Sequence, residues 1–435
     1  MSDFSILPEW MSPGHRPEEV GQTSALLTIQ CGDHIATRNE DDWSKSVHSS
    51  VCLSAYPLAL WFAASWWRLL WEPAPGRSPD TEWRMAHELP AAGYGFLWPK
   101  LTFESDGESV VVLSEPTDST SRDPVRYLER FAFSLKLPIF EAAVSDFINL
   151  VVARLRAVGI KESELHHIWR EATEERDDQE TSLFRRLEAG LGFDPDEAPQ
   201  RLLETLRAIS KDAGEAATFE IAPALSKTAS ELLVLNLQEL AGSEGLAGEV
   251  EPPPPLLALV GDATYQKYPV WERGWLLARG ARSVWGLHLE PLSNITFSDI
   301  LNADISKPSY GIHDKLPLGL AVRNRPGSAR LNFHFRRTNS TGRRFEAARL
   351  LADHLLAPSK DRWLPETDAK TARQKIQRAF AAEFLCPIDG LKNFLNDDFS
   401  NDAIEDAGRH FDVSPLLVRS HLANNGVISP DAVVD

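Results

Sequence analysis

The sequence predicts an α+β protein that is mostly helical and divided into several domains. Residues 1–120 contain β-type runs, at 24–38 and 101–116, separated by turn signals such as Asp106-Gly107. Residues 121–240 instead repeat apolar side chains every three or four positions, which is typical of helices. A segment rich in Gly and Pro follows at 241–257. We therefore expect a mixed N-terminal domain at 1–120, a helical domain at 121–240, a linker at 241–257 and a C-terminal domain at 258–435.

The most apolar part of the N-terminal region is residues 51–71, "VCLSAYPLALWFAASWWRLLW", which holds four of the 13 tryptophans. Its length would suit a membrane span. However, Pro57 interrupts it and Arg68 lies within it. We expect a buried helix with a Trp-rich flank, and no membrane partner.

Net charge and cysteine content narrow the possible partners and compartment. The formal net charge is −18, and it is uneven: residues 261–435 carry 23 Lys/Arg and 21 Asp/Glu, whereas residues 1–260 carry the other 22 and 42. An acidic body of this kind disfavours general nucleic-acid binding. The three cysteines, Cys31, Cys52 and Cys386, lie far apart and form no CxxC pair. This predicts no disulfide framework and no cysteine zinc site, and it favours a reducing cytoplasm.

Four consecutive prolines at 252–255 end the expected linker. Such a run favours a stiff, extended spacer. The alternative is a proline-rich peptide that an aromatic groove could bind.

Residues 343–358, "RRFEAARLLADHLLAP", are expected to form a helix. Phe345, Ala348, Ala352 and Leu355 would form one apolar stripe, with polar side chains on the opposite face. Pro358 would end the helix, since proline cannot continue it.

Four stretches of the C-terminal part, in this order and spacing, carry a resemblance to a known family. They are "PVWERGWLLARGARSVWGL" at 269–287, "LGLAVRNRPGSARLNFHFRRTNSTGRRF" at 318–345, "RAFAAEFLCP" at 378–387 and "AIEDAGRHFDVSPLLVRSHLANNGVI" at 403–428. Together they resemble the ImmA/IrrE family of zinc-dependent endopeptidase-like proteins, over about residues 268–428. The resemblance implies a zincin-like domain with a small antiparallel sheet, ending in a helix-turn-helix-like pair.

The resemblance also shows what this chain lacks. Active members carry HExxH, in which two histidines hold zinc and the glutamate activates the bound water. On that frame Arg349 and Asp353 replace the histidines, Leu350 replaces the glutamate, and Ile376 replaces the third ligand. We therefore expect no zinc cofactor and no catalysis at these positions. Glu346, Arg349 and Asp353 are spaced to form ion pairs along the helix, with Ile376 as apolar cover.

Two alternatives use other residues. A rearranged metal site could draw on Asp353, His354, His334 and Glu383, although adjacent residues on a helix diverge by about 100°. A nucleic-acid surface could use the basic residues of the C-terminal part, namely Arg336, Arg337, Arg343, Arg344, Arg419 and His421. The segment 412–422 reads as the second helix of a helix-turn-helix, with Ser414 as N-cap and Pro415 as first helical residue. Its acidic neighbours at 394–406 favour structural packing over DNA reading.

These observations favour a non-catalytic, ImmA/IrrE-like protein that binds another protein or peptide segment as a regulatory or scaffold component. The family resemblance suggests a setting in phage or mobile-element defence or a toxin–antitoxin-like system. Two functions remain as alternatives: a metallo-endopeptidase with a rearranged site that cleaves a regulatory protein, and a DNA-binding regulator. An unrelated enzymatic activity within residues 1–240 also stays open.

Overall fold

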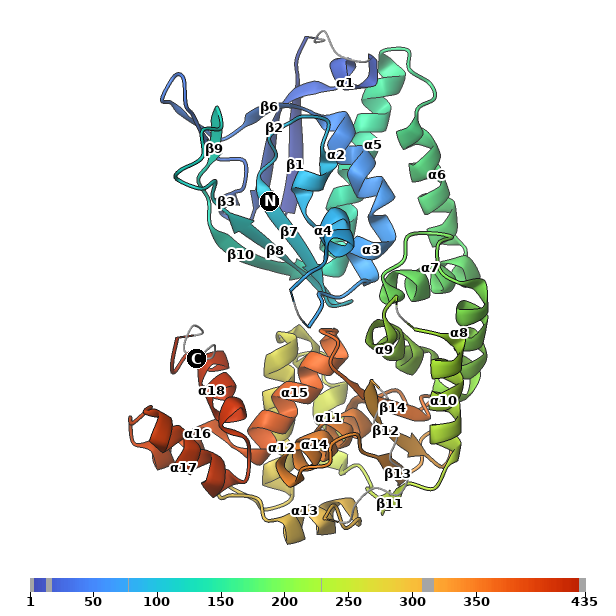
Figure 1. Cartoon of the computed structure of the whole chain (residues 1–435), viewed down its shortest axis with the longest axis vertical. Coiled ribbons are helices and arrows are strands. Elements are labelled where there is room, and N and C mark those ends of the chain that lie inside the picture. The colour runs from blue at the N-terminus through green and yellow to red at the C-terminus, as the bar shows by residue number, and fades with distance from the viewer. Residues whose placement is uncertain (1–3, 13–17, 77, 228, 307–316, 430–435) are drawn as a thin grey trace. The chain divides into compact units, whose positions relative to one another are not determined.

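The computed structural model describes residues 4–12, 18–76, 78–227, 229–306 and 317–429 (Figure 1). The chain forms two compact units, Met1–Pro199 and Gln200–Asp435. Each unit combines helices with small antiparallel sheets, which confirms the predicted α+β class.

Unit 1 contains three small antiparallel sheets. The strands of the first are β1 (Phe4–Trp10), β2 (Ser24–Cys31), β3 (His34–Ile35) and β6 (Val51–Ser54). The second has the order β10 (Phe131–Lys136), β8 (Ser109–Glu115) and β7 (Lys100–Ser105). The third joins β5 (Val47–His48), β4 (Asn39–Asp41) and β9 (Val125–Tyr127). Alternate residues of β2 and β8 are buried, as period-two strands with one face on a core require.

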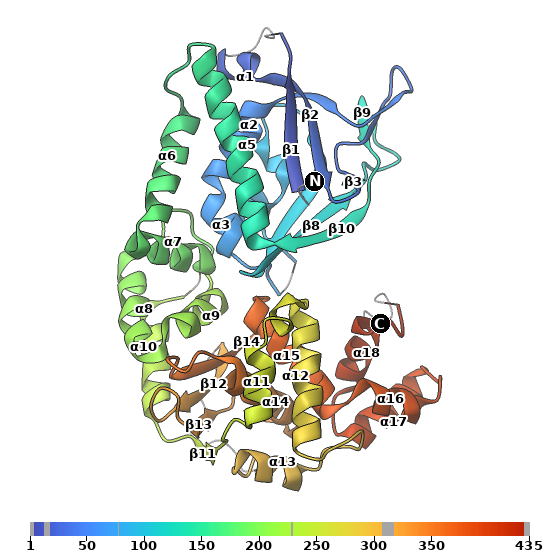
Figure 2. The ribbon, with the colours of Figure 1, turned by 180° about the vertical axis from the view of Figure 1, so that it is seen from behind.

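The helices of unit 1 pack against these sheets and against one another. They are α1 (Glu18–Gln22), α2 (Ala55–Ala64), α3 (Trp66–Trp71), α4 (Thr81–His87), the 3₁₀ helix η1 (Leu89–Ala92), α5 (Leu137–Ala157), α6 (Glu164–Asp177) and α7 (Gln179–Leu191). Figure 2 shows α5 lying beside β1, and the two elements pack together. Phe4, Phe62, Phe103 and Phe140 meet between strands and helices in the core.

The apolar segment 51–71 forms strand β6 followed by two short helices, α2 and α3, which separate at Ser65. Trp61, Trp66 and Trp67 are buried, in agreement with the expected buried, Trp-rich segment. Among the described residues, no helix has both the length and the hydropathy needed to cross a membrane.

Unit 2 is a helical body around one four-stranded antiparallel sheet. The sheet order is β11 (Leu246–Glu249), β13 (Arg330–His334), β12 (Leu318–Arg323) and β14 (Trp363–Thr367). The helices are α8 (Gln200–Ala213), α9 (Glu215–Leu225), α10 (Glu231–Gly242), α11 (Pro254–Gly261), η2 (Tyr265–Lys267), α12 (Val270–Val284), α13 (Asn294–Leu301), α14 (Ser340–Leu356), α15 (Ala372–Leu385), α16 (Ile388–Leu395), α17 (Asn401–Phe411) and α18 (Pro415–Asn424).

The expected helical domain at 121–240 is divided differently in the structure. Its first residues form β9 and β10 with the N-terminal strands, and α8, α9 and α10 belong to unit 2. Side-chain and backbone contacts explain why α8 belongs to unit 2. Arg362 N donates to Ala213 O at 2.9 Å, and Trp363 Nε1 donates to Asp212 at 3.1 Å. The end of α8 is therefore bonded to the start of β14.

The expected linker at 241–257 is also part of the folded unit. Strand β11 pairs with β13 from Leu246↔Phe333 to Glu249↔Arg330. The last prolines start α11, because proline fits the first helical turn, where no N–H donor is needed. The segment therefore contains a strand and the first turn of a helix, and the expected extended spacer is wrong.

Helix α14, the expected helix around 343–358, begins earlier than predicted, at Ser340, with Asn339 as its N-cap. It packs against β14 and α15. Helix α15 in turn lies against α12, where a Cβ on Gly274 would come within 2.7 Å of Ile376 O. Glycine at this position lets the two helices approach closely.

Candidate functional site

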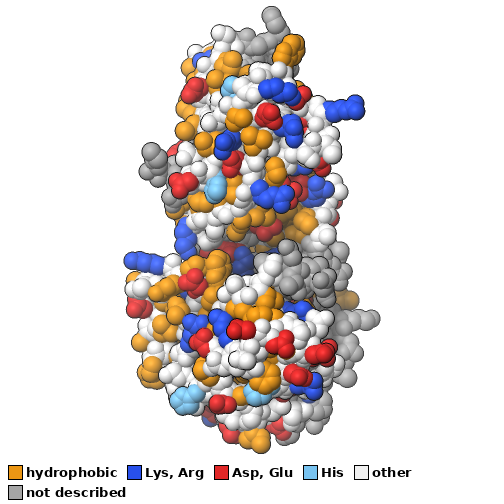
Figure 3. Space-filling view, turned by 90° about the vertical axis from the view of Figure 1, so that its left-hand side faces the viewer, with side chains coloured by type: hydrophobic (Ala, Val, Ile, Leu, Met, Phe, Trp, Pro, Cys, Tyr) orange, Lys and Arg blue, Asp and Glu red, His pale blue; other side chains and the backbone are white. Residues whose placement is uncertain are grey.

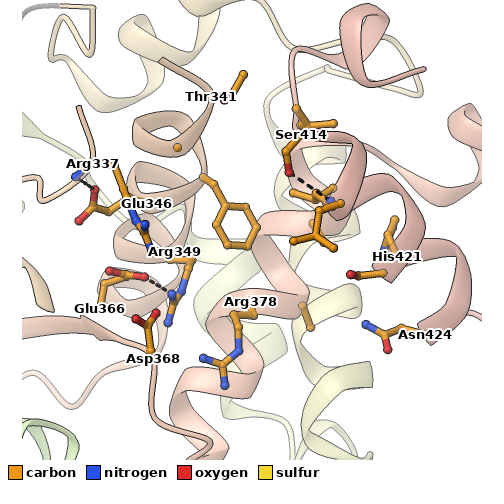
Figure 4. A pocket seen from close by; sticks show the side chains of 18 of the residues that line it. Arg337, Thr341, Glu346, Arg349, Glu366, Asp368, Arg378, Ser414, His421 and Asn424 are labelled. Atoms are coloured by element: carbon orange, nitrogen blue, oxygen red, sulfur yellow. Dashed lines mark hydrogen bonds and ion pairs between the residues drawn. The ribbon is translucent and has the colours of Figure 1, made fainter. Parts of the chain in front are cut away.

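A pocket of about 770 Å³ lies in unit 2 between α12, α14, α15 and α18 (Figure 4). One wall is apolar and is formed by Trp271, Trp275, Phe345, Val413, Leu416 and Leu417. A second part of the lining, the charged wall, is formed by Arg337, Glu346, Arg349, Glu366, Asp368 and Arg378. The pocket thus brings together the degenerate motif helix and the C-terminal helix pair.

The N-cap of α18 and the spacing of two tryptophans on α12 position the residues of the apolar wall. Ser414 caps α18 by accepting from Leu417 N at 3.1 Å, and Pro415 occupies the first turn, as the sequence predicted. Trp271 and Trp275 are four residues apart on α12, so both lie on one helix face. Trp271 is 45% exposed and Leu416 is 61% exposed, so this wall offers apolar surface to a ligand.

Arg349, which we expected at the position of the first zinc-binding histidine from the resemblance, is only 3% exposed. It forms an ion pair with Glu366 of β14, and it donates to Thr367 O at 2.6 Å and to Gln374 Oε1 at 2.7 Å. Burial lowers the pKa of the Arg349 guanidinium, and the Glu366 charge opposes this. A buried guanidinium with its own partners therefore occupies this part of the pocket.

Gln374 is itself fixed by buried partners. Its Nε2 donates to Glu220 Oε2 of α9 at 3.0 Å and to Pro365 O at 3.0 Å, while its Oε1 also accepts from Thr367 N at 2.9 Å. Burial raises the pKa of Glu220. Through Glu220, helix α9 thus fixes the position of Gln374, which binds Arg349.

Glu366 also binds a second arginine. Arg336 donates to its two carboxylate oxygens at 3.0 and 3.1 Å, and to both oxygens of Asp368 at 3.0 and 2.7 Å. The hydrogen bonds from Arg336 lower the pKa of Asp368. Glu366 and Asp368 are therefore both paired with arginines within the fold.

Glu346 lies next to Glu366 on the same wall. Burial, together with the Glu366 charge, raises the pKa of Glu346 to about 7. Its two oxygens accept the backbone N–H groups of Arg336, at 2.9 Å, and Arg337, at 3.1 Å. A Cβ at Gly319 would overlap Glu346 Oε1, so only glycine leaves room for this carboxylate beside the sheet.

The predicted ion pairs along the helix are not the ones that form. Arg349 pairs with Glu366 rather than with Glu346 or Asp353, and Asp353 pairs with Arg373 of α15 at 2.6 and 2.8 Å. The polar face of α14 is buried against β14 and α15, so its charges find partners on those elements.

Leu350 and Ile376 do not lie at the pocket. Leu350 is fully buried in the core of unit 2, and Ile376 packs with Val270 and Ala372. The residue of α15 that contacts Arg349 is Gln374. The expected apolar cover by Ile376 is therefore wrong, because the helix turns that side chain toward α12.

The residues of the alternative metal site contact other partners instead of meeting at one point. His354 Nε2 lies 2.9 Å from Val250 O, and burial lowers the pKa of His354 to about 4. Glu383 lies 2.8 Å from Arg279 and 3.0 Å from His421, and His334 is buried on strand β13. No group of three His, Cys, Asp or Glu side chains that could hold a metal ion occurs among the residues that the structure describes.

The basic residues proposed for nucleic acid do not share one free surface. Arg344 is buried and donates to Leu292 O at 2.8 Å, and His421 is 2% exposed. Arg336 is bound to the carboxylates described above. Arg419 donates to Asn401 at 2.6 Å, Arg343 to Ser306 O at 3.4 Å, and Arg337 is exposed beside the pocket. On the face shown in Figure 3, acidic and basic side chains alternate without a continuous basic patch.

Sequence reasoning missed several residues that build this site. Glu366, Asp368 and Gln374 belong to no recognisable motif. The packing of α14 against β14 brings Glu366 and Asp368 to it, and the packing of α14 against α15 brings Gln374. The spacing of Trp271 and Trp275 was the one available signal for the apolar wall. The chain matches no protein-family model, no curated protein and no solved structure.

Proposed function

We propose that unit 2 is a non-catalytic binding domain that holds a segment of another protein in the pocket between α12, α14, α15 and α18. The observation that carries the proposal is the pairing of Arg349 with Glu366 in a pocket that also has an exposed apolar wall. A site whose carboxylates are already paired within the fold is suited to binding rather than to activating water.

The chemistry of the pocket supports this choice over a peptidase. Glu346, with its raised pKa, is the natural candidate for a general base. However, both of its oxygens accept backbone N–H groups, which fixes it as a structural partner of the segment at 336–337. Leu350, at the position of the catalytic glutamate, cannot accept a proton and is buried in the core.

The size of the pocket favours a short segment. A cavity of 770 Å³ falls within the ~300–1,000 Å³ of typical ligand pockets. It suits a few side chains of a partner rather than a folded domain. Such a protein would act as a regulatory or scaffold component, and the family resemblance suggests the phage or mobile-element setting.

The test compares two substitutions at exposed apolar positions. Leu416→Asp places a charge on the apolar wall, whereas Ile295→Asp does the same on α13, outside the pocket, where Ile295 is 76% exposed. Neither side chain is in the core, so both variants should fold. Tagged full-length proteins would be recovered from host cells and their partners quantified by mass spectrometry.

We expect at least one partner to be lost with Leu416→Asp and retained with Ile295→Asp. Identical partners for wild type and Leu416→Asp would refute the proposal. Peptide cleavage that persists in Leu416→Asp and stops on chelation would favour the peptidase instead.

A further inference from the structure

The carboxylates of the pocket wall already have partners. Glu366 is bound by Arg336 and Arg349, Asp368 is bound by Arg336 through both oxygens, and Glu346 accepts two backbone N–H groups. These groups have little remaining attraction for a cation. A basic ligand would have to displace an internal arginine.

Arg378 is in a different position. It projects from α15 into the pocket, and its guanidinium donates to Ala369 O at 2.9 Å and to Thr367 O at 3.4 Å (Figure 4). Both acceptors are neutral carbonyls, and no carboxylate of the described residues lies within 4.0 Å of it. Burial and the nearby charge of Arg349 lower the pKa of Arg378 to about 10. The charge of Arg378 is thus only partly compensated within the fold.

The other charges at the pocket act in the same direction. The acidic side chains that line it, Glu346, Glu366 and Asp368, are already bound by arginines or by backbone N–H groups, so they oppose an anionic ligand only weakly. Arg337 is exposed beside the motif helix. A ligand that brings a negative charge next to an apolar group therefore complements both walls at once.

We infer that the protein segment held in this pocket carries a carboxylate that binds Arg378, next to a bulky apolar side chain that packs on Trp271 and Leu416. The inference rests on the proposed function and names the chemistry of the partner. A guanidinium can bind a carboxylate through two parallel hydrogen bonds, which fixes the orientation of the segment. The carboxylate is either an Asp or Glu side chain or the free C-terminus of the partner.

The experiment selects peptides on the immobilised full-length protein from two random twelve-residue libraries. One library displays peptides with blocked C-termini, so it offers side-chain carboxylates only, and the other displays free C-termini. Selected peptides that fail to bind Leu416→Asp are pocket-dependent. Their affinities are then measured by fluorescence polarisation for wild type, Arg378→Gln and Arg325→Gln, an exposed arginine outside the pocket.

We expect pocket-dependent peptides to combine an aromatic or large aliphatic residue with a carboxylate, and the library that yields them identifies its source. Arg378→Gln should weaken their binding about tenfold or more, and Arg325→Gln should leave it unchanged. Because Arg378→Gln also removes bonds to carbonyls, a peptide-side change provides an independent test. Neutralising the peptide carboxylate should weaken binding to wild type by a similar factor, and should have little further effect on Arg378→Gln.

The outcomes separate the two proposals. Pocket-dependent peptides whose affinity does not change when the carboxylate is neutralised would overturn this inference and leave the proposed function standing. If neither library yields a peptide that depends on Leu416, both proposals are refuted.

Discussion

Replacing Glu366 with glutamine should destabilise unit 2 more than replacing its ion-pair partner Arg349 with methionine. The asymmetry follows from the number of charged partners that each side chain has. Glu366 is bound by Arg336 as well as by Arg349, whereas among the described residues Glu366 is the one carboxylate that forms an ion pair with Arg349. Glu366→Gln leaves a buried guanidinium without an opposite charge, while Arg349→Met leaves Glu366 still paired.

The magnitudes can be worked out from these contacts. Removing one partner of a buried ion pair costs about 3–5 kcal/mol when the remaining charge is uncompensated. In Arg349→Met the loss is limited to two hydrogen bonds, to Thr367 O and Gln374 Oε1, which still accept from Arg378 and from Thr367 N, so the cost is about 1–3 kcal/mol. The difference between the variants is then about 2 kcal/mol. For a unit of this size it corresponds to a melting temperature about 4–8 °C lower for Glu366→Gln.

The assay is thermal unfolding of the full-length protein by circular dichroism, combined with hydrogen exchange of peptides from α14 and α15. Hydrogen exchange reports on unit 2 alone and so separates its stability from that of unit 1. The double variant should be less destabilised than the sum of the two single variants, because it removes both charges. If Arg349→Met proves the more destabilising change, or if neither variant loses 1 kcal/mol, the pairing scheme is wrong.

Three further results are expected. His354 has a folded pKa of about 4 against 6.5 normally, so the unfolded state binds more protons between these values. The free energy of unfolding should therefore fall as the pH drops from 6.5 to 4. In urea unfolding, its decrease between pH 7 and pH 4.5 should be about 2–3 kcal/mol smaller for His354→Gln than for wild type. Gly319→Ala should cost about 1–3 kcal/mol by crowding Glu346, whereas Gly242→Ala, where an added Cβ meets nothing within 4 Å, should be neutral or stabilising in the same urea assay. Elemental analysis of the purified protein should find no stoichiometric zinc, and chelation should leave the melting temperature unchanged; a bound equivalent whose removal lowers it would contradict the pairing of Arg349 and Glu366.

Local sequence patterns determined a good part of this protein. Apolar spacing predicted the helix that became α14, β-type runs between turn signals predicted strands of unit 1, and Ser414 with Pro415 predicted the start of α18. These features depend on backbone preferences and on neighbours within one or two turns, so the sequence alone specifies them.

Only the tertiary structure decided which partners the buried charges take. Nothing in the spacing of α14 indicates that Arg349 binds Glu366 of β14 and that Asp353 binds Arg373 of α15. The same holds for β11, which looked like part of a linker until its pairing with β13 placed it in the sheet. A charge buried in a fold must be compensated by whatever side chain packs against it, and elements distant in sequence supply that side chain. The helix is therefore a property of its own residues, whereas the pocket is a property of the packing of α12, α14, α15, α18 and β14.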